Sequence, residues 1–186
     1  MRGPYIITES CTFDLTTLGL KIGDIINVIC IGGGGGTDYD MWSQGFGGGA
    51  CGKIHSSGAR YCGPGAGSGY VAKGTFQITG STSVTVTIGS AGTSTATTSV
   101  VGGTGGTTSF GSYLSAAGGA GAKGSGSSDS ENSSPGIGGN NGSYGGSSYV
   151  NAAGGLGFVN DGIFSVKTAD GSGIQTNGKG VVFLWW

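Results

Sequence analysis

The stretch CIGGGGGTDYDMWSQGFGGGACG, from Cys30 to Gly52, places large side chains between two tracts of glycine. A run of five glycines, 32–36, comes first, and the aromatic Tyr39 and Trp42 follow within six residues of its end. Two interpretations fit this pattern. Either the glycines form a flexible linker that happens to contain a tryptophan, or they form an ordered scaffold that presents the aromatic residues.

The rest of the chain favours the ordered scaffold. Glycine accounts for 46 of the 186 residues and proline for only 3, which excludes collagen and lies near the composition of disordered low-complexity chains. The glycines are unevenly spread, however, with 15 in 32–69 and 19 in 102–157. The blocks between them carry strand patterns, which a disordered linker would lack.

Alternating polar and apolar residues predict several β-strands. In CTFDL (11–15), one face carries Cys11, Phe13 and Leu15, whereas IINVICI (25–31) is apolar on both faces and suits a central strand. The segments 71–78 and 83–88 alternate around a Gly-Ser-Thr turn and predict a hairpin. Further strands are expected at 107–117, 163–168 and 180–186. No window has the apolar spacing of a helix, and glycine disfavours helices.

The glycine-rich blocks can be ordered only through their backbone. Polyproline-II segments direct every N–H and C=O outward, so several of them can hydrogen-bond side by side where the contact positions lack a Cβ. The expected fold is therefore all-β and irregular, with a β-sandwich-like base and a polyglycine-II bundle. The alternative is a sandwich with flexible glycine loops. One domain, 1–186, would contain base strands and bundle segments, the strands at about 5–31, 70–88, 107–117 and 163–186 and the bundle at about 32–69 and 102–157.

Several classes of function are disfavoured. A net charge of -1 without a basic run argues against nucleic-acid binding, and no apolar run is long enough to cross a membrane. The start, Met1 to Pro4, does not resemble a signal peptide, so an extracellular protein is expected to leave the cell by another route, such as lysis. The two G-x-G-x-x-G matches are expected by chance at this glycine content. Catalytic motifs are lacking, so we expect no enzyme, no cofactor and no metal.

The candidate contact residues lie between the two glycine tracts. Trp, Tyr and Arg are enriched at binding hot spots, and Tyr with Gly and Ser is typical of adaptable binding loops. For Trp42, packing against the body of the protein is an equal alternative, and His55 is expected to make contacts rather than act as a base. The candidates are Tyr39, Asp40, Met41, Trp42, Phe46, His55, Arg60 and Tyr61.

The four cysteines do not match a zinc pattern. Cys11 and Cys30 fall in predicted strands and are expected to be small buried apolar groups. Cys51 and Cys62 bracket a polar loop, and a disulfide between them is a possibility that the spacing leaves open.

The order of blocks resembles glycine-rich bacteriophage tail proteins. The matching stretches are ICIGGGGG (29–36), GSGYVAKGTFQITGSTSVTVTIGSAG (67–92), GGTGGTTSFGSYLSAAGGAG (102–121) and GKGVVFLWW (178–186). The sequence is similar to the receptor-binding tips of tail fibres, including the adhesins of T-even-like phages. That resemblance implies a polyglycine-II bundle whose tip loops recognise a receptor on the host surface. The long N-terminal attachment domain of those adhesins is not evident in this sequence, and cysteines are unusual in that family.

The leading hypothesis is a non-enzymatic adhesin at the tip of a phage tail fibre, located in the virion. Its partners would be a host cell-surface receptor (a protein or a glycan), another tail-fibre protein and, in a homo-oligomer, further copies of itself. One alternative is a structural decoration protein of the virion that binds no receptor. A less favoured one is an ice-binding protein, because TSTATTS (93–99) supplies threonines but a regular flat array is not evident.

Overall fold

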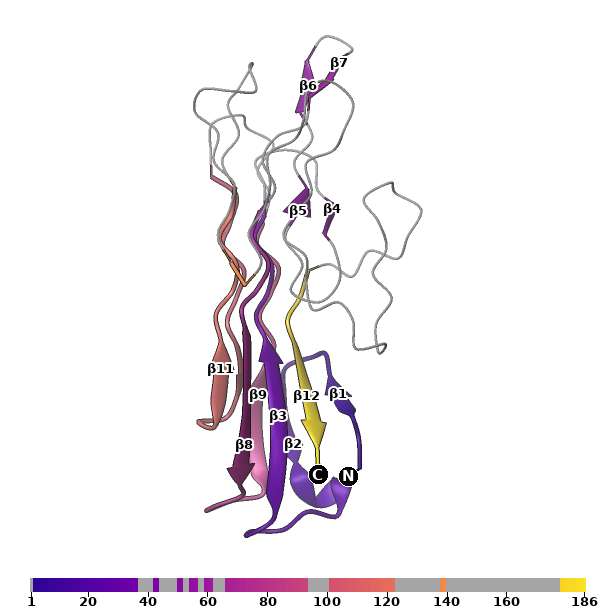
Figure 1. The fold of residues 1–186 in the computed structure, drawn as a ribbon, viewed down its shortest axis with the longest axis vertical. Helices are drawn as coiled ribbons and strands as arrows, with labels where there is room; N and C mark the ends of the chain where they lie inside the picture. Colours follow the sequence, from indigo (N-terminus) through magenta and orange to yellow (C-terminus); the bar gives the residue numbers. More distant parts are fainter. Residues whose placement is uncertain are drawn as a thin grey trace.

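A computed structural model describes residues 2–36, 42–43, 50–51, 54–56, 59–61, 66–93, 101–122, 138–139 and 178–186. This part of the chain is nearly all β-structure, and its strands form two four-stranded antiparallel sheets and two short two-stranded ones. Within the described ranges there is no α-helix, only the 3-10 turn η1 (Leu15–Leu18). Figure 1 shows both termini at the end of the molecule where the large sheets lie.

The first sheet has the strand order β1-β12-β3-β8 and brings the two ends of the chain together. Its strands are β1 (Tyr5–Ile7), β12 (Val181–Trp185), β3 (Ile25–Ile31) and β8 (Val71–Gln77). The apolar strand β3 is central, as its sequence predicts, because it pairs with β12 on one side and β8 on the other.

The second sheet has the order β11-β10-β9-β2. Its strands are β11 (Leu114–Ala116), β10 (Thr108–Phe110), β9 (Ser83–Thr87) and β2 (Cys11–Asp14). The alternation in β9 directs Val84 and Val86 inward and leaves Thr85 exposed, as expected from SVTVTI.

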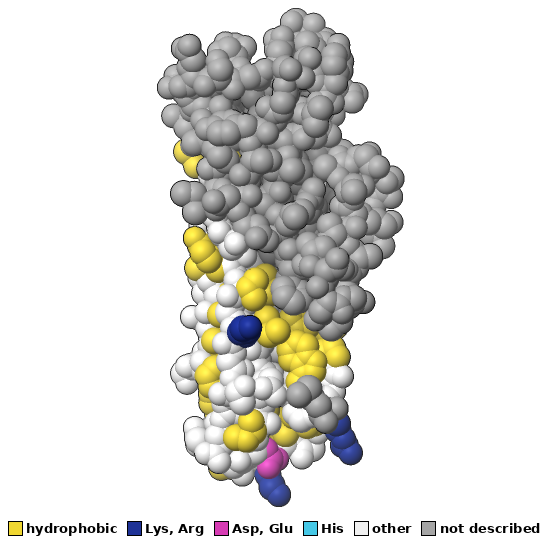
Figure 2. Space-filling view, viewed as in Figure 1, with side chains coloured by type: hydrophobic (Ala, Val, Ile, Leu, Met, Phe, Trp, Pro, Cys, Tyr) yellow, Lys and Arg dark blue, Asp and Glu magenta, His cyan; other side chains and the backbone are white. Residues whose placement is uncertain are grey.

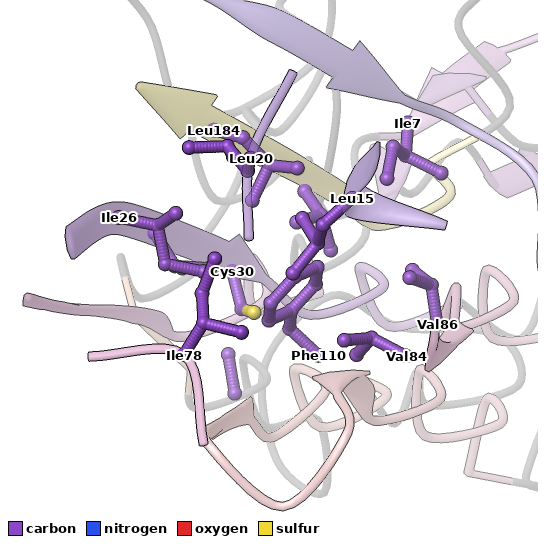
Figure 3. Packing of buried hydrophobic residues seen from close by; sticks show 13 residues of the cluster. Ile7, Leu15, Leu20, Ile26, Cys30, Ile78, Val84, Val86, Phe110 and Leu184 are labelled. Atoms are coloured by element: carbon purple, nitrogen blue, oxygen red, sulfur yellow. The ribbon is translucent and has the colours of Figure 1, made fainter. Parts of the chain in front are cut away.

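The main hydrophobic core lies between the two sheets and takes residues from both. Figure 3 shows the ring of Phe110 surrounded by Leu15, Cys30 and Val84, all of which are buried. Side chains of this size contribute about 1.5–3 kcal/mol each when they are fully removed from water. A smaller apolar cluster (Ile31, Val181 and Phe183) lies on the opposite face of the first sheet, because alternate residues of β3 and β12 point outward.

The strand predicted over 11–15 is one residue shorter in the structure. Asp14 caps η1 by accepting a hydrogen bond from the Thr16 N–H at 3.0 Å, which also lowers the pKa of its carboxyl. Gly19 ends the turn with a φ of 77°. The polar cap therefore terminates β2, and Leu15 enters the core from the 3-10 turn.

The predicted hairpin of 71–78 with 83–88 is wrong, although both strands exist. β8 pairs with β3 and β9 pairs with β2 and β10, so the two strands belong to different sheets. Ile78 is fully buried where the chain crosses between the sheets, and Gly80 turns with a φ of 73°. The two strands pack against one core from opposite sides. This arrangement is favoured over a local hairpin, which would place both strands in a single sheet.

Two other expectations are corrected. The strand predicted over 107–117 is a hairpin of β10 and β11, which turns at Gly111 with a φ of 52°. Cys11 is exposed rather than buried because β2 is an edge strand, whereas Cys30 is buried as expected. The closing strand near 180–186 is confirmed as β12. The strand predicted at 163–168 lies outside the described residues.

Six stretches, here called the glycine segments, continue strands of the two large sheets. They are 32–36, 66–70, 89–93, 101–107, 117–122 and 178–180. The segment 32–36 is fully buried, and its successive N–H groups donate hydrogen bonds to three neighbouring segments in turn. Gly32 and Gly35 donate to Tyr70 and Gly67 at 3.0 and 2.9 Å.

The rotation continues along the same segment. Gly33 and Gly36 donate to Gly106 and Gly103, both at 2.9 Å, and Gly34 donates to Gly178 at 2.8 Å. Every third residue thus returns to the same neighbour, whereas a strand repeats every two residues. The carbonyls of 32–36 accept bonds from the two remaining segments, 89–93 and 117–122.

Close approach explains the choice of glycine at these positions. A Cβ on Gly35 would overlap the backbone carbonyl of Ala120, and one on Gly32 would overlap that of Ala117. The overlapping atoms are backbone, so they cannot move aside without breaking the hydrogen bonds described above.

We predict that Gly35→Ala lowers the free energy of unfolding by about 3 kcal/mol, because the new methyl group must displace a neighbouring segment. Gly80→Ala is the matched control. It has open space around it, so only its φ of +73° opposes a Cβ and the cost is about 1 kcal/mol. Urea unfolding of both variants measures the difference. Equal losses in the two variants would contradict the close packing.

Candidate functional site

The candidate site is defined by where the glycine segments end. Each segment is joined at one end to a strand: 32–36 follows β3, 89–93 follows β9 and 117–122 follows β11. The other three precede strands, 66–70 leading into β8, 101–107 into β10 and 178–180 into β12. Three segments therefore come from each sheet, and the chain leaves and re-enters the sandwich through them.

The ends of the segments that lie away from the sheets are close together. Gly36 donates to Gly103 at 2.9 Å and accepts a bond from Ala122 at 3.0 Å. Gly103 donates in turn to Thr93 at 2.7 Å, and Gly102 donates to Ala122 at 2.9 Å. Residues far apart in the sequence thus form one hydrogen-bonded layer at the end of the segments.

This layer fixes where the connections begin and end. The connection 37–65 starts after Gly36 and returns at Ala66, and Gly67, the next residue, accepts a bond from Gly35. The connection 94–100 joins Thr93 to Val101, and the residues after Ala122 leave from the same layer. The connections therefore leave the glycine segments at the end opposite to the two large sheets, a fact that the sequence cannot reveal.

Four short strands lie within the connection 37–65. They are β4 (Trp42–Ser43), β5 (Ala50–Cys51), β6 (Ile54–Ser56) and β7 (Ala59–Tyr61). Figure 1 shows β6 and β7 at the end of the molecule remote from both termini.

The structure places several of the predicted contact residues in paired strands. In the β6–β7 hairpin, His55 is the Cα partner of Arg60, and Ile54 is the partner of Tyr61. Trp42 is the partner of Cys51 in the β4–β5 pair. Tyr39, Asp40, Met41 and Phe46 lie outside the described residues, as does Cys62, so the assignment of these residues and the Cys51–Cys62 disulfide stay predictions.

The described surface carries few charges. Figure 2 shows that Lys, Arg and acidic side chains are sparse on the visible face of the sandwich. One ion pair, Lys179 with Glu9 at 2.9 Å, is exposed. In the described ranges no group of three or more His, Cys, Asp and Glu residues could hold a metal ion. Among the same residues there is no helix of the length and hydropathy needed to span a membrane.

Among the described residues, the group whose pKa departs most from its ordinary value is the Cys30 thiol. Burial in the core raises the pKa of its thiol to about 12, and its Sγ contacts the Leu114 carbonyl oxygen at 3.9 Å. The thiol is therefore neutral and inaccessible, and it serves as a small apolar core group.

A cleft that the sequence did not indicate lies between two turns of the sandwich. It has a volume of about 280 Å³ and is lined by residues from 79–85 and 111–113. The alternation in SVTVTI predicts exposed Thr85, but only the fold brings Ser112 and Tyr113 next to it.

Comparison with known proteins does not assign the chain to a group: no family model matches it, and no curated protein or solved structure shows significant similarity to it.

We predict that stability falls above about pH 9 partly because of Cys30. Its pKa in the folded protein is raised to about 12, so the unfolded chain loses the proton first and is favoured as the pH rises through this range. The contribution is at most about 1.4 kcal/mol per pH unit. Urea unfolding at about pH 8 and about pH 10.5 measures it.

The comparison with two variants isolates this thiol. Cys30→Ala removes the titrating group and should decrease the loss of stability between the two pH values. Cys11→Ala, at an exposed position, is the control and should retain the loss seen in the parent protein. An unchanged pH dependence in Cys30→Ala would show that the buried thiol does not titrate as described.

Proposed function

We propose that the glycine segments are polyproline-II helices packed as a polyglycine-II bundle. The support is the period of three in the hydrogen bonds of 32–36, because a polyproline-II helix has three residues per turn. The requirement for glycine where a Cβ would meet a neighbouring carbonyl is a second argument for this packing.

We further propose that the chain is an adhesin at the tip of a bacteriophage tail fibre and recognises a receptor on the host cell surface. The observation that carries this proposal is the single layer formed by Gly36, Thr93, Gly103 and Ala122, from which the connections leave together. A scaffold that fixes the ends of several neighbouring connections is the arrangement that binding proteins use to present variable loops.

The ordered backbone of the glycine segments favours a high affinity for the proposed receptor. Residues 32–36 are buried and their hydrogen bonds involve all of the other glycine segments, so the chain is already ordered where the connections start. A connection whose ends are already fixed loses less conformational entropy on binding than one whose ends are free.

The connection 37–65 is the proposed contact surface. It contains the aromatic and charged residues expected at hot spots, and His55, Arg60 and Tyr61 lie in a hairpin remote from the termini. The sheets and both termini lie at the opposite end, where the chain would be attached to another tail-fibre protein or assembled with further copies of itself. The protein would then act in the virion, without a cofactor or catalytic chemistry.

A structural decoration protein of the virion remains the alternative, because a rigid bundle also resists proteolysis. Deletion of the protein would abolish adsorption of the phage to its host only if the chain is the adhesin. Ice binding is a lesser alternative, and a measurement of thermal hysteresis with the purified protein distinguishes it.

We predict that the combined change of Tyr39, Trp42 and Tyr61 to Ala abolishes binding of the purified protein to host cells. The change removes a tryptophan and two tyrosines, the residue types that are enriched at binding hot spots. The fold should be retained, because the core lies between the two sheets. Binding is measured with fluorescent protein on whole cells of strains that differ in surface proteins and glycans.

The matched control changes three exposed residues of the second sheet, Thr12, Thr87 and Ser115, to Ala. This variant should bind cells like the parent protein. If the aromatic variant binds as well as this control, the connection 37–65 is not the contact surface.

A further inference from the structure

The cleft between the β8–β9 connection and the β10–β11 turn lies on the sandwich, away from the proposed contact surface. Six of its lining residues carry hydroxyl groups: Thr79, Ser81, Ser83, Thr85, Ser112 and Tyr113. We propose that this cleft is a second binding site, which takes one ring of a neutral saccharide.

The two walls of the cleft are held together by Tyr113. Its hydroxyl accepts a hydrogen bond from the Thr79 N–H at 3.0 Å and donates one to the Thr79 carbonyl at 3.1 Å. The ring packs against Phe76 and Phe110 of the core, with centroid distances of 5.7 and 6.0 Å. The tyrosine therefore joins two turns that are separated in the sequence and fixes the width of the cleft.

Backbone hydrogen bonds hold the rest of the cleft in place. The Gly111 N–H donates to the Thr85 carbonyl at 2.8 Å, which attaches the β10–β11 turn to β9. In the other turn, the Ser83 N–H donates to the Ser81 Oγ at 3.0 Å, and Ser81 donates its own N–H to the Thr79 carbonyl at 2.8 Å. The site is thus formed before any ligand arrives.

Four of the hydroxyls are available to a ligand. Those of Thr79, Ser83, Thr85 and Ser112 make no hydrogen bond to any residue in the part of the chain that the structure describes, and all four residues are exposed. A hydroxyl group both donates and accepts, as do the hydroxyls of a sugar, so the two sets can pair in several orientations.

The chemistry of the lining selects a neutral ligand. No charged residue lines the cleft, so it offers neither the cations that an anion such as phosphate requires nor the carboxylates that a metal ion prefers. The partly exposed ring of Tyr113 adds an apolar surface for the C–H face of a sugar ring. The strands and turns that line the cleft belong to the sandwich.

The size of the cleft limits the ligand and its affinity. A volume of about 280 Å³ lies just below the range of small-molecule pockets, about 300–1,000 Å³, so the ligand is limited to a single sugar unit. An open site of this size binds in the millimolar range, so it would act on a repeating surface glycan through many copies of the protein.

The experiment titrates the purified, isotope-labelled protein with methyl glycosides of glucose, galactose, mannose and N-acetylglucosamine, with N-acetylneuraminic acid as the anionic comparator. Chemical-shift changes and saturation transfer report binding and its location. We expect at least one neutral glycoside to shift the amides of 79–85 and 111–113 and to bind more tightly than the anion.

Two double variants test the hydroxyls. Thr85→Val with Ser112→Ala removes two of the free hydroxyls and should weaken binding by at least about tenfold, because two hydrogen bonds are lost. Thr87→Val with Ser115→Ala makes the same changes on the same exposed face of the second sheet but outside the cleft, and should leave binding unchanged. Amide spectra of both variants confirm their fold.

Three results would overturn the proposal. They are the lack of any shift with all four neutral glycosides, binding that survives in Thr85→Val with Ser112→Ala, and shifts confined to residues outside the cleft. None of these bears on the contact surface at 37–65, because the cleft variants keep every residue of that connection and their binding to host cells is measured separately.

Discussion

The hydrogen bonds between backbone groups of neighbouring glycine segments are the interaction on which the rest of the structure depends. The segment 32–36 is surrounded by chain from every glycine segment, and its N–H groups turn from one neighbour to the next. Each bond contributes only about 0.5–1.5 kcal/mol, so the arrangement needs all of them and tolerates few side chains between the segments. Gly32 and Gly35 have no space for a Cβ because the neighbouring carbonyls approach so closely.

The sandwich and the glycine segments support each other through continuous chain. Three segments continue strands of one sheet and three continue strands of the other, so the core around Phe110 fixes the positions from which the segments start. Hydrophobic burial thus supplies the stability that side chains of the glycine segments cannot. At the outer end of the segments, the buried apolar cluster formed by the described residues consists of Ala66 and Ala122.

Local patterns were enough to predict most strands of the sandwich but not their partners. IINVICI predicts β3 because a strand buried on both faces is apolar along most of its length. SVTVTI predicts β9 because a strand buried on one face alternates between apolar and polar residues. The pairing of 71–78 with 83–88 failed because both strands pack on a shared core from opposite sides, which only the whole fold reveals. The break at Gly111 was missed since a single glycine inside a strand pattern is weak evidence for a turn. For the candidate site, composition located the connection 37–65, whereas its position at one end of the molecule required the hydrogen bonds of Gly36.

The period of three along 32–36 also restricts how such a chain can change in length. Inserting or deleting one residue would direct every later N–H of the segment toward a different neighbour, and the glycines would no longer coincide with the close contacts. A change of three residues restores the register, but only if the adjoining segments change by the same amount. Variation in length is therefore expected to accumulate in the connections, while the segments grow or shrink together in steps of three residues.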